Sequence, residues 1–404
     1  MAGALDGVRV LDLSRVLAGP WATQILADLG AEVIKVERPG EGDDTRAWGP
    51  PFVGEGEDRQ SAYFLSANRG KRSICVDLAA PEGQGIVRRL AQRADVVVEN
   101  FKVGALARYG LDWESLCLLN PRLVYCSITG FGQDGPYAQR PGYDFLIQAM
   151  GGLMSVTGAP DGPPMKAGVA LVDILTGLYA CNGIQAALRH RDRTGQGQRI
   201  DIALLDCLMA SMANQALSTL VTGQDPPRLG NAHPSIAPYD VFPTADGHLI
   251  LAVGNDGQFA RLCQVLGAPE LASDPAFATN AARAVNRPVL TERLNALLAA
   301  RTCADWLARL EAANVPAGPI NGLSAAFDDP QTKARGLRIE VPHARLGKAP
   351  GVASPLRLST TPPAYERGPP VLGQDTGAVL GEILGLDAAE IAALFVAGVV
   401  AGTR

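Results

Sequence analysis

The sequence predicts an α/β protein with a large Rossmann-like domain, built on a parallel sheet, and a smaller α+β domain. Up to about residue 200, short apolar runs typical of buried strands alternate with helical segments. A later block has its own pattern of a strand followed by amphipathic helices, and the chain then returns to the large domain. We therefore assign residues 1–200 and 345–404 to the large domain, 201–224 to linker helices, 225–330 to the small domain and 331–344 to a return linker.

The N-terminal segment predicts a strand–helix–strand unit. GVRVLDL (7–13) and AEVIKVE (31–37) are typical of strands, and residues 21–29 between them are typical of a helix. No GxGxxG is present, so a nicotinamide dinucleotide site is not expected. The Gly- and Pro-rich residues 39–52 predict a long ordered loop.

The alternation continues with predicted strands at 72–77, 94–99 and 123–128 and predicted helices at 81–93 and 111–120. Ligands of open parallel sheets bind outside the carboxyl ends of the strands. This rule places residues 14–18, Arg38, Asn100, Phe101 and residues 129–132 on one rim. The alternatives are that Asn100 only terminates its strand and that Arg38 is a solvated surface charge.

The second half of the chain has a different organisation. The GQGQ turn at 195–198 is expected to end the alternating section, and two helical stretches then reach residue 223. GHLILAVGNDGQF (247–259) predicts a strand, a loop and a helix start. The other expected elements are helices at 288–300 and 303–313, a strand at 337–341, and helices at 373–384 and 387–396.

The composition favours a cytoplasmic protein without a nucleic-acid or membrane partner. The chain has 404 residues and a net charge of −5, with no basic block. No signal peptide is visible, and the most apolar run, residues 391–402, is short for a membrane span. The seven cysteines lack CxxC spacing and the four histidines are far apart, so neither a disulfide framework nor a metal site is expected.

Asp173 is the first candidate for chemistry, in the stretch AGVALVDILTG (167–177). Residues 169–172 predict a short buried segment, and a helix from 174 to about 190 follows, so the carboxylate lies where the two meet. Burying a carboxylate costs free energy unless the group is paired, caps a helix or is reactive. As an N-cap, Asp173 would accept N–H groups of the first helical turn. As a nucleophile, it would form a covalent acyl intermediate.

Several long motifs, in order, carry a family resemblance. They are SRVLAGPWATQILADLGAEVIKVERPG (14–40), LSANRGKRSI (65–74), ADVVVENFKVGALARYGLDW (94–113), ITGFGQDGPYAQRPGYD (128–144) and GVALVDILTGLYA (168–180). On these motifs the chain resembles the family III CoA-transferases (CaiB/BaiF type), a group that includes formyl-CoA transferases and related α-methylacyl-CoA racemases. GDDTRAWGPPF (42–52), GLMSVTG (152–158), HPSIAPY (233–239) and VLGQDT (371–376) resemble the subgroup that uses dicarboxylic acids.

The resemblance implies transfer of CoA from an acyl-CoA, with succinyl-CoA as the expected donor, to a dicarboxylic acid such as glutarate. It makes Asp173 the nucleophile, which the helix N-terminus is expected to keep ionised. CoA is a co-substrate, and no permanently bound cofactor or metal is expected. The positions that match CoA-contacting residues of the family are Val16, Ala18, Arg38, Asn100, Phe101, Ala105 and Arg108, with Lys71 and Arg72 near another.

Two rival functions are a racemase or isomerase of the same fold and a non-catalytic CoA-binding protein. The racemases carry a His where this chain has Tyr143, and a tyrosine with a pKa of about 10 suits proton transfer poorly. The retained carboxylate at Asp173 disfavours the non-catalytic alternative.

The second carboxylate of a diacid needs a cation or a hydroxyl–His cluster. Arg15, Arg46, His233 and Ser235 are the candidates, with surface charge or loop hydrogen bonding as the alternative. Gly254, Asn255, Asp256 and Gly257 stand where formyl-CoA transferases have a glycine-rich loop over the active site, and an ordinary turn is the alternative. The resemblance also implies an interlocked homodimer.

Overall fold

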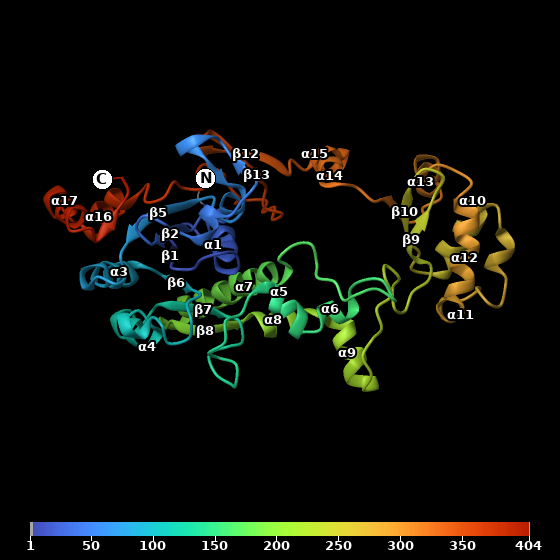
Figure 1. Ribbon diagram of the computed structural model, residues 1–404, viewed down its shortest axis with the longest axis horizontal. Coiled ribbons are helices and arrows are strands. Elements are labelled where there is room, and N and C mark those ends of the chain that lie inside the picture. Colours follow the sequence, from blue (N-terminus) through green and yellow to red (C-terminus); the bar gives the residue numbers. More distant parts are fainter. Residues whose placement is uncertain (1–2, 404) are drawn as a thin grey trace. The chain divides into compact units, whose positions relative to one another are not determined.

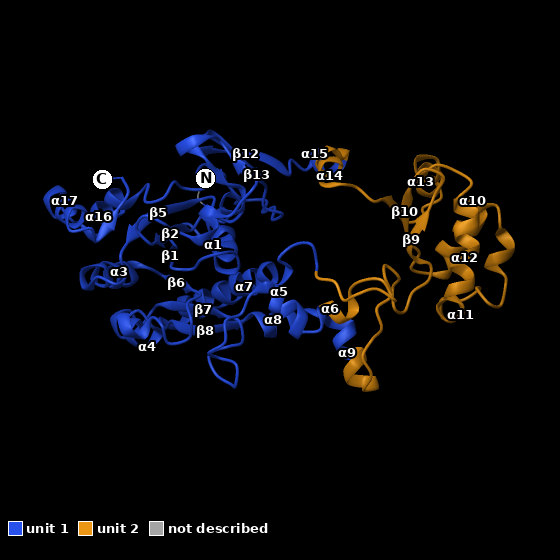
Figure 2. Cartoon of the chain, in the orientation of Figure 1, with its two compact units in different colours: residues 1–153, 167–217, 331–404 blue, residues 154–166, 218–330 orange. Residues whose placement is uncertain are grey.

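The computed structural model of the protein describes residues 3–403 (Figure 1). The chain divides into two compact units (Figure 2). Unit 1 comprises residues 1–153, 167–217 and 331–404, and unit 2 comprises residues 154–166 and 218–330.

Unit 1 is built on a seven-stranded sheet of order β14-β5-β2-β1-β6-β7-β8. The strands are β1 (Arg9–Asp12), β2 (Glu32–Glu37), β5 (Lys71–Val76), β6 (Val96–Glu99), β7 (Val124–Thr129), β8 (Gln198–Ala203) and β14 (Val400–Ala401). All neighbouring strands are parallel except β14, which pairs antiparallel with β5. After β5 the chain returns to the other side of β1, so the strand order reverses between β1 and β6. Open α/β sheets bind their ligands at such a point.

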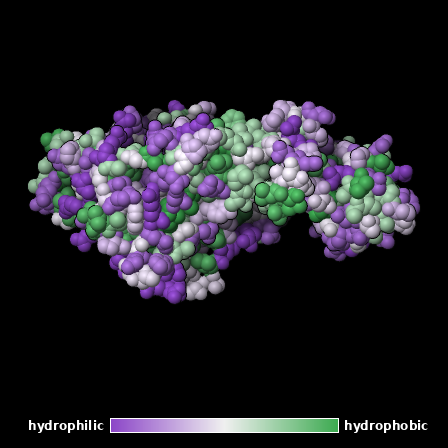
Figure 3. Space-filling model, turned by 90° about the horizontal axis from the view of Figure 1, so that it is seen from below, coloured by the Kyte–Doolittle hydropathy of each residue, from purple (hydrophilic) through white to green (hydrophobic). Residues whose placement is uncertain are grey.

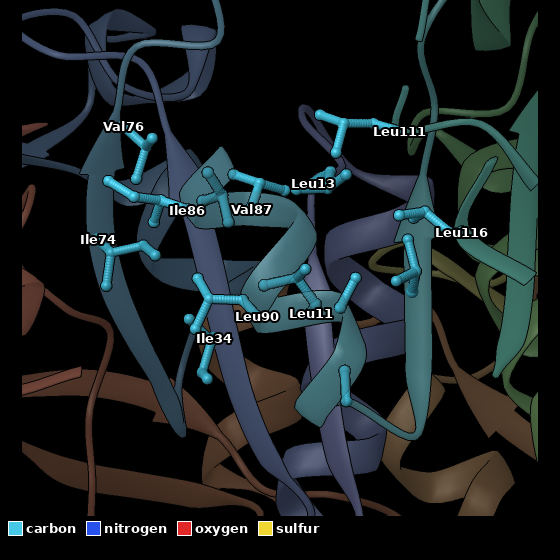
Figure 4. Close-up of a cluster of buried hydrophobic side chains, with 14 of the residues drawn as sticks. Leu11, Leu13, Ile34, Ile74, Val76, Ile86, Val87, Leu90, Leu111 and Leu116 are labelled. Atoms are coloured by element: carbon cyan, nitrogen blue, oxygen red, sulfur yellow. The ribbon is translucent and has the colours of Figure 1, made fainter. Parts of the chain in front are cut away.

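Helices cover both faces of this sheet. One face packs against α1 (Ala18–Asp28), α5 (Asp144–Met150), α7 (Leu171–Thr194) and α8 (Leu204–Ser211). The other face packs against α3 (Pro81–Arg93), α4 (Trp113–Leu119), α16 (Thr376–Leu384) and α17 (Ala388–Val396). Because successive strand residues point to opposite faces, Val10 belongs to the first core and Leu11 to the second. Figure 4 shows Leu11, Ile34 and Ile74 packed against Ile86 and Leu90 of α3.

Smaller elements complete unit 1. The two hairpins are formed by β3 (Phe52–Val53) with β4 (Gln60–Ser61), and by β12 (Arg338–His343) with β13 (Gly347–Val352). The short helices are η1 (Asp44–Ala47), η2 (Gly56–Asp58), α2 (Ala62–Ala67) and η3 (Ala107–Tyr109). Along the chain, the division between the two units falls within α6 (Leu153–Val156), α9 (Ala213–Thr222) and α15 (Pro330–Ala334).

Unit 2 has a core of its own. Its antiparallel sheet of order β11-β10-β9 consists of β9 (Tyr239–Pro243), β10 (His248–Ala252) and β11 (Ala317–Pro319). Phe242, Leu249 and Leu251 of this sheet are buried in the same core as Phe259 and Trp306. The helices are α10 (Asp256–Leu266), η4 (Pro269–Ala272), α11 (Asn280–Val285), α12 (Arg287–Leu298), α13 (Cys303–Ala312) and α14 (Leu323–Asp328).

α7 is long and apolar enough to cross a membrane by length and composition, with a mean hydropathy of 1.3 over its most apolar stretch. α8 and α9 together would pass the same test, but a bend of 78° separates them. Core packing gives a sufficient reason for the apolarity of α7, because Ala180, Ile184 and Leu188 are buried against the sheet and α1.

Two expectations about secondary structure were wrong. The alternating section does not end at 195–198, because residues 198–203 form β8 at the edge of the main sheet. Residues 169–172 are not a buried segment before the helix: Val169 is 63% exposed, and α7 already begins at Leu171.

Candidate active site

A cavity of about 350 Å³ in unit 1 lies at the carboxyl ends of β1, β6 and β7, where the strand order reverses. Its walls are residues 15–18, 100–103, 128–130 and 140–144, together with Asp44, Ala138, Asp173 and Leu204. The predicted rim residues 14–18, Asn100, Phe101 and 129–132 therefore fall at or beside one cavity. None of the residues that line it is a histidine.

Asp173 lines this cavity but is not the N-cap of α7. The N-cap is Ala170, which leaves Asp173 as the third residue of the first turn. Asp144 does the capping from α5: its Oδ1 accepts the backbone N–H of Val172 at 2.7 Å and that of Asp173 at 3.4 Å. The carboxylate of Asp173 therefore does not cap the helix, and the capping alternative is wrong. Its oxygens are not used by the N–H groups of the first turn.

The charge state of Asp173 differs from the sequence-based expectation. Burial, and then the nearby negative charge of Asp144, raise the pKa of Asp173 to about 7. The helix N-terminus does not keep this carboxylate fully ionised at neutral pH, because Asp144 already occupies the N–H groups of that turn. A carboxylate with a raised pKa at a cavity wall is a candidate for a reactive group.

Asp144 is held in place from two directions. Its Oδ2 accepts a hydrogen bond from Gln148 Nε2 at 2.6 Å, and Gln148 Oε1 accepts the backbone N–H of Ala167 at 2.9 Å. A Cβ atom on Gly142 would lie 2.3 Å from the Cα of Gly130, so only glycine allows these two backbones to touch. This contact brings the loop that carries Tyr143 and Asp144 back to the end of β7.

The hydroxyl of Tyr63 on α2 belongs to the same electrostatic environment. Burial, followed by the charges of Asp173, Asp144 and Asp43, raises the pKa of Tyr63 to about 12, so it stays protonated. Its ring packs edge-on against Trp48, with ring centroids 5.1 Å apart. Tyr63 is therefore protonated and feels the charge of both carboxylates, but it is not one of the residues that line the cavity.

The structure brings together some of the predicted CoA-binding residues and separates others. Val16, Ala18, Asn100 and Phe101 line the cavity that Asp173 lines. Arg38 is 74% exposed and pairs with Glu41 outside the cavity wall. Ala105 lies on the following loop and Arg108 on η3; neither lines the cavity, and the Arg108 guanidinium stacks on the ring of Tyr109.

Two predicted CoA ligands need correction. The ammonium of Lys71 is fully buried, where it donates to Asp12, to the carbonyl of Pro20 and to Asn68. It therefore cannot reach a phosphate. The guanidinium of Arg72 pairs with Glu32 at 2.9 Å and with Glu382 at 2.8 Å.

Among the candidates for the second carboxylate, Arg15 lines the cavity and pairs with Asp44 at 3.0 Å. Arg46 is wrong as a free cation, because it forms a double hydrogen bond with the buried carboxylate of Glu37. Sequence reasoning missed Lys102 and Arg140, which add two positive charges to the cavity wall.

The remaining candidates belong to unit 2. His233 accepts the backbone N–H of Ser235 through Nδ1 at 3.0 Å. Asn255 is the N-cap of α10 and accepts the N–H of Gln258, whose Oε1 in turn accepts the N–H of Gly254. The loop containing Gly254, Asn255 and Gly257 is therefore an ordered helix start. A role for these residues in a lid or in substrate binding stays a prediction.

Comparison of the chain with known proteins indicates one family. The model of CoA-transferase family III matches residues 5–376. The chain is 56% identical to the succinate–glutarate CoA-transferase of Agrobacterium fabrum, over 94% of this chain and 95% of that enzyme. It is 46% identical to the succinyl-CoA:glutarate CoA-transferase of Mus musculus, over 98% of this chain and 90% of that enzyme. The crystal structure of a CAIB/BAIF family protein from Brucella suis superposes with a TM-score of 0.85 at 52% identity, covering 95% of this chain and all of that one.

Proposed function

The chain belongs to CoA-transferase family III, and on this basis we propose that it transfers CoA from succinyl-CoA to glutarate through a covalent intermediate on Asp173. The observation that carries the proposal is the position of the Asp173 carboxylate, which lines one cavity together with Val16, Ala18, Asn100 and Phe101. The strand order of unit 1 is that of a Rossmann-like domain, which supports a nucleotide-containing ligand at the ends of β1 and β6.

The first half of the reaction loads CoA onto the enzyme. The ionised carboxylate of Asp173 attacks the carbonyl carbon of succinyl-CoA and expels the CoA thiolate, which leaves a mixed succinyl–aspartyl anhydride. The thiolate then attacks the aspartyl carbonyl. Succinate leaves, and an aspartyl–CoA thioester remains.

The second half repeats these steps with the acceptor. A carboxylate of glutarate attacks the aspartyl thioester and releases the thiolate, and the thiolate attacks the glutaryl carbonyl of the new anhydride. Glutaryl-CoA forms and Asp173 is regenerated as a carboxylate. One thioester replaces another, so no external energy source is required.

The cavity cations supply the electrostatics of this scheme. Positive charges fixed at the cavity wall stabilise the oxyanion that develops when a thioester or anhydride carbonyl is attacked. Arg140, whose guanidinium lies over the ring of Tyr137, is our candidate for the distal carboxylate of succinyl or glutaryl groups. Arg38 and Arg108, outside the cavity, remain candidates for the phosphates of CoA.

We also propose that the protein works as a homodimer. Several large apolar side chains are exposed in the single chain on α5 and α7: Phe145, Leu146, Met150, Leu178 and Tyr179. Exposed apolar residues, green in Figure 3, interrupt the hydrophilic surface. Large apolar side chains exposed on two neighbouring helices are expected where another protein binds. Light scattering should give twice the chain mass of 42.3 kDa.

The decisive experiment combines a donor–acceptor panel with mass analysis. Glutarate, itaconate, citramalate and malate are offered as acceptors for succinyl-CoA, and product CoA esters are quantified. The enzyme incubated with succinyl-CoA alone should carry a CoA adduct, or a hydroxylamine-sensitive acyl group, at Asp173. Asp173→Ala should lose transfer while still binding CoA.

Asp192→Asn is the matched control, because Asp192 lies near the far end of the same helix and is exposed. Its activity should equal that of the parent enzyme. Comparable turnover by Asp173→Ala would remove the assignment of the nucleophile. Exchange of the α-proton in deuterated water without acyl transfer would instead indicate an isomerase.

A further inference from the structure

Among residues 3–403, the backbone groups of Ser14, Arg15 and Val16, in the loop between β1 and α1, form hydrogen bonds with side chains and none with other backbone groups. Ser14 N–H donates to Asp12 Oδ1 at 2.9 Å, and the Ser14 carbonyl accepts from Lys35 Nζ at 2.8 Å. Asn100 holds both backbone groups of Arg15, at 2.9 Å and 2.7 Å. Asp43 accepts the N–H of Val16 at 3.2 Å and 3.3 Å. Side chains from other parts of unit 1 therefore dictate the path of this loop.

Val16 has a backbone conformation that valine rarely adopts. Its φ is +70°, in the left-handed region that favours glycine, and a β-branched side chain is particularly disfavoured there. Such a conformation persists only where its surroundings impose it. Val16 also lines the cavity that Asp173 lines, so the strained residue is part of the candidate active site.

The acceptor of the Val16 N–H, Asp43, belongs to a buried ion pair. Lys35 Nζ and Asp43 Oδ2 are 2.9 Å apart, and both side chains are completely inaccessible to solvent. Burial alone would raise the pKa of Asp43, but the charge and hydrogen bond of Lys35, with hydrogen bonds from Thr45, lower it to about 2. The neighbouring carboxylates, Asp43 first, also raise the pKa of Lys35 against the effect of burial, so both members of the pair are ionised at neutral pH.

Stability is a weak reason for such a pair. Burying two charges removes their hydration, and well-packed apolar residues often serve the fold equally well. Apolar residues at these two positions, however, could neither accept a hydrogen bond from the N–H of Val16 nor donate one to the carbonyl of Ser14. We propose that Lys35 and Asp43 are positioning residues that hold the loop of Ser14–Val16 in the shape that binds the thioester end of CoA. The proposal rests on CoA occupying the Asp173 cavity.

Asp43→Asn tests the proposal, because it keeps the size of the side chain but removes its charge and turns an amide N–H₂ toward Lys35 or Val16. We expect the KM for succinyl-CoA and the Kd for free CoA to rise at least tenfold, while kcat at saturation changes less than threefold. Asp28→Asn is the matched control: Asp28 forms a nearly buried pair with Arg69 at 2.6 Å and forms no hydrogen bond with the loop. It should lower the Tm and leave KM unchanged. Equal effects of the two variants on KM would overturn the proposal.

A double-mutant cycle with Val16→Gly gives a second readout, which loss of stability alone would not produce. Glycine adopts a φ of +70° without strain. In the Val16→Gly variant, the loop should therefore depend less on the hydrogen bonds from the N–H of residue 16 to Asp43. The rise in Kd caused by Asp43→Asn should be at least threefold smaller in the Val16→Gly background. Independent, multiplicative effects would show that Asp43 does not act through Val16.

Hydrogen–deuterium exchange separates failure of this proposal from failure of the proposed function. CoA should protect the amides of residues 14–17 in the parent enzyme. No protection would mean that CoA binds elsewhere, whatever Asp43 does.

If Asp43→Asn does not fold, Thr45→Val removes only one donor to Asp43, at 2.7 Å, and should raise KM two- to threefold with little change in Tm. An unchanged KM in that variant would contradict the positioning role.

Discussion

The carboxylate of Asp144 accepts the backbone N–H of Val172 at 2.7 Å and thereby caps the helix that carries Asp173. The same carboxylate is a negative charge beside Asp173, and it contributes to the raised pKa of that residue. Orientation and charge state of the proposed nucleophile therefore depend on one side chain.

The pH dependence of the reaction follows from this arrangement. Burial and the charge of Asp144 disfavour the ionised form of Asp173, so the attacking carboxylate forms only as the pH rises through about 7. We expect kcat/KM for succinyl-CoA to increase with pH and to level off above an apparent pKa near that value. Initial rates in a constant-ionic-strength buffer series check this, and a flat profile through neutral pH would contradict it.

Asp144→Asn should shift that profile to lower pH. The amide oxygen can still accept the N–H of Val172, but the negative charge beside Asp173 is gone, so the carboxylate loses its proton more easily. The midpoint of kcat/KM against pH is the measurement. Asp144→Ala, which removes both the charge and the cap, should in addition lower the free energy of unfolding by about 1 kcal/mol. A midpoint that stays in place would assign the raised pKa to burial alone.

Asp173→Asn should make the protein more stable at alkaline pH. The pKa of Asp173 is higher in the folded state, at about 7, than the unperturbed value of 3.8. The folded state therefore binds the proton more tightly, and stability falls as the pH rises between these two values. At pH 8 we expect the free energy of unfolding of the asparagine variant to exceed that of the parent by roughly 1–2 kcal/mol. This value is smaller than the full pKa difference implies, because Asp173 is partly exposed and solvent screens its charge. Thermal unfolding should show a clearly larger difference at pH 8 than at pH 5, because at pH 5 only the lower part of the window between the two pKa values has been passed.

Gly177→Ala should damage the packing of α1 on α7. A Cβ atom at this position would lie 2.8 Å from the carbonyl oxygen of Ala18, a backbone atom of the cavity wall. We expect a loss of about 1–3 kcal/mol in the free energy of unfolding, measured by denaturant titration, and a higher KM for succinyl-CoA. Gly183→Ala on the same helix meets Ile200 at an ordinary 3.4 Å and should be neutral or slightly stabilising. Equal losses in the two variants would exclude the close contact as the cause.

Arg140→Gln should weaken binding of the diacid more than binding of CoA. Loss of a charge-assisted hydrogen bond of about 1.5–3 kcal/mol corresponds to a 10- to 100-fold higher KM for glutarate. Calorimetric titration with free CoA, which lacks the distal carboxylate, is the control and should change less than threefold. A comparable loss for CoA would assign Arg140 to the nucleotide instead.

The sequence predicted most of the large sheet because its central strands are continuous apolar runs. β8 was missed because it is an edge strand in which exposed Gln198, Arg199 and Asp201 alternate with less exposed residues. The segment before Asp173 was read as a buried strand because it is apolar, although tertiary packing leaves Val169 exposed and starts the helix at Leu171. Local apolarity does not show what a segment packs against.

The candidate site was predicted in part, for a similar reason. Asp173 and the rim residues Val16, Ala18, Asn100 and Phe101 could be found from motifs and from the rule that ligands bind at strand ends. Asp144 could not be linked to α7, because its partner Val172 lies far along the chain. The two basic residues 71 and 72 were expected at CoA because a sequence shows a charge but not the carboxylates that neutralise it.

The loop of residues 14–16 also bears on protein engineering. A transplanted peptide of this sequence would arrive in a new scaffold without the aspartates, the lysine and the asparagine that determine its shape. Grafting would therefore have to carry those four side chains along, each from its own place in the fold. Redesign of acyl-group preference is better attempted at Arg140, whose side chain is not one of these four.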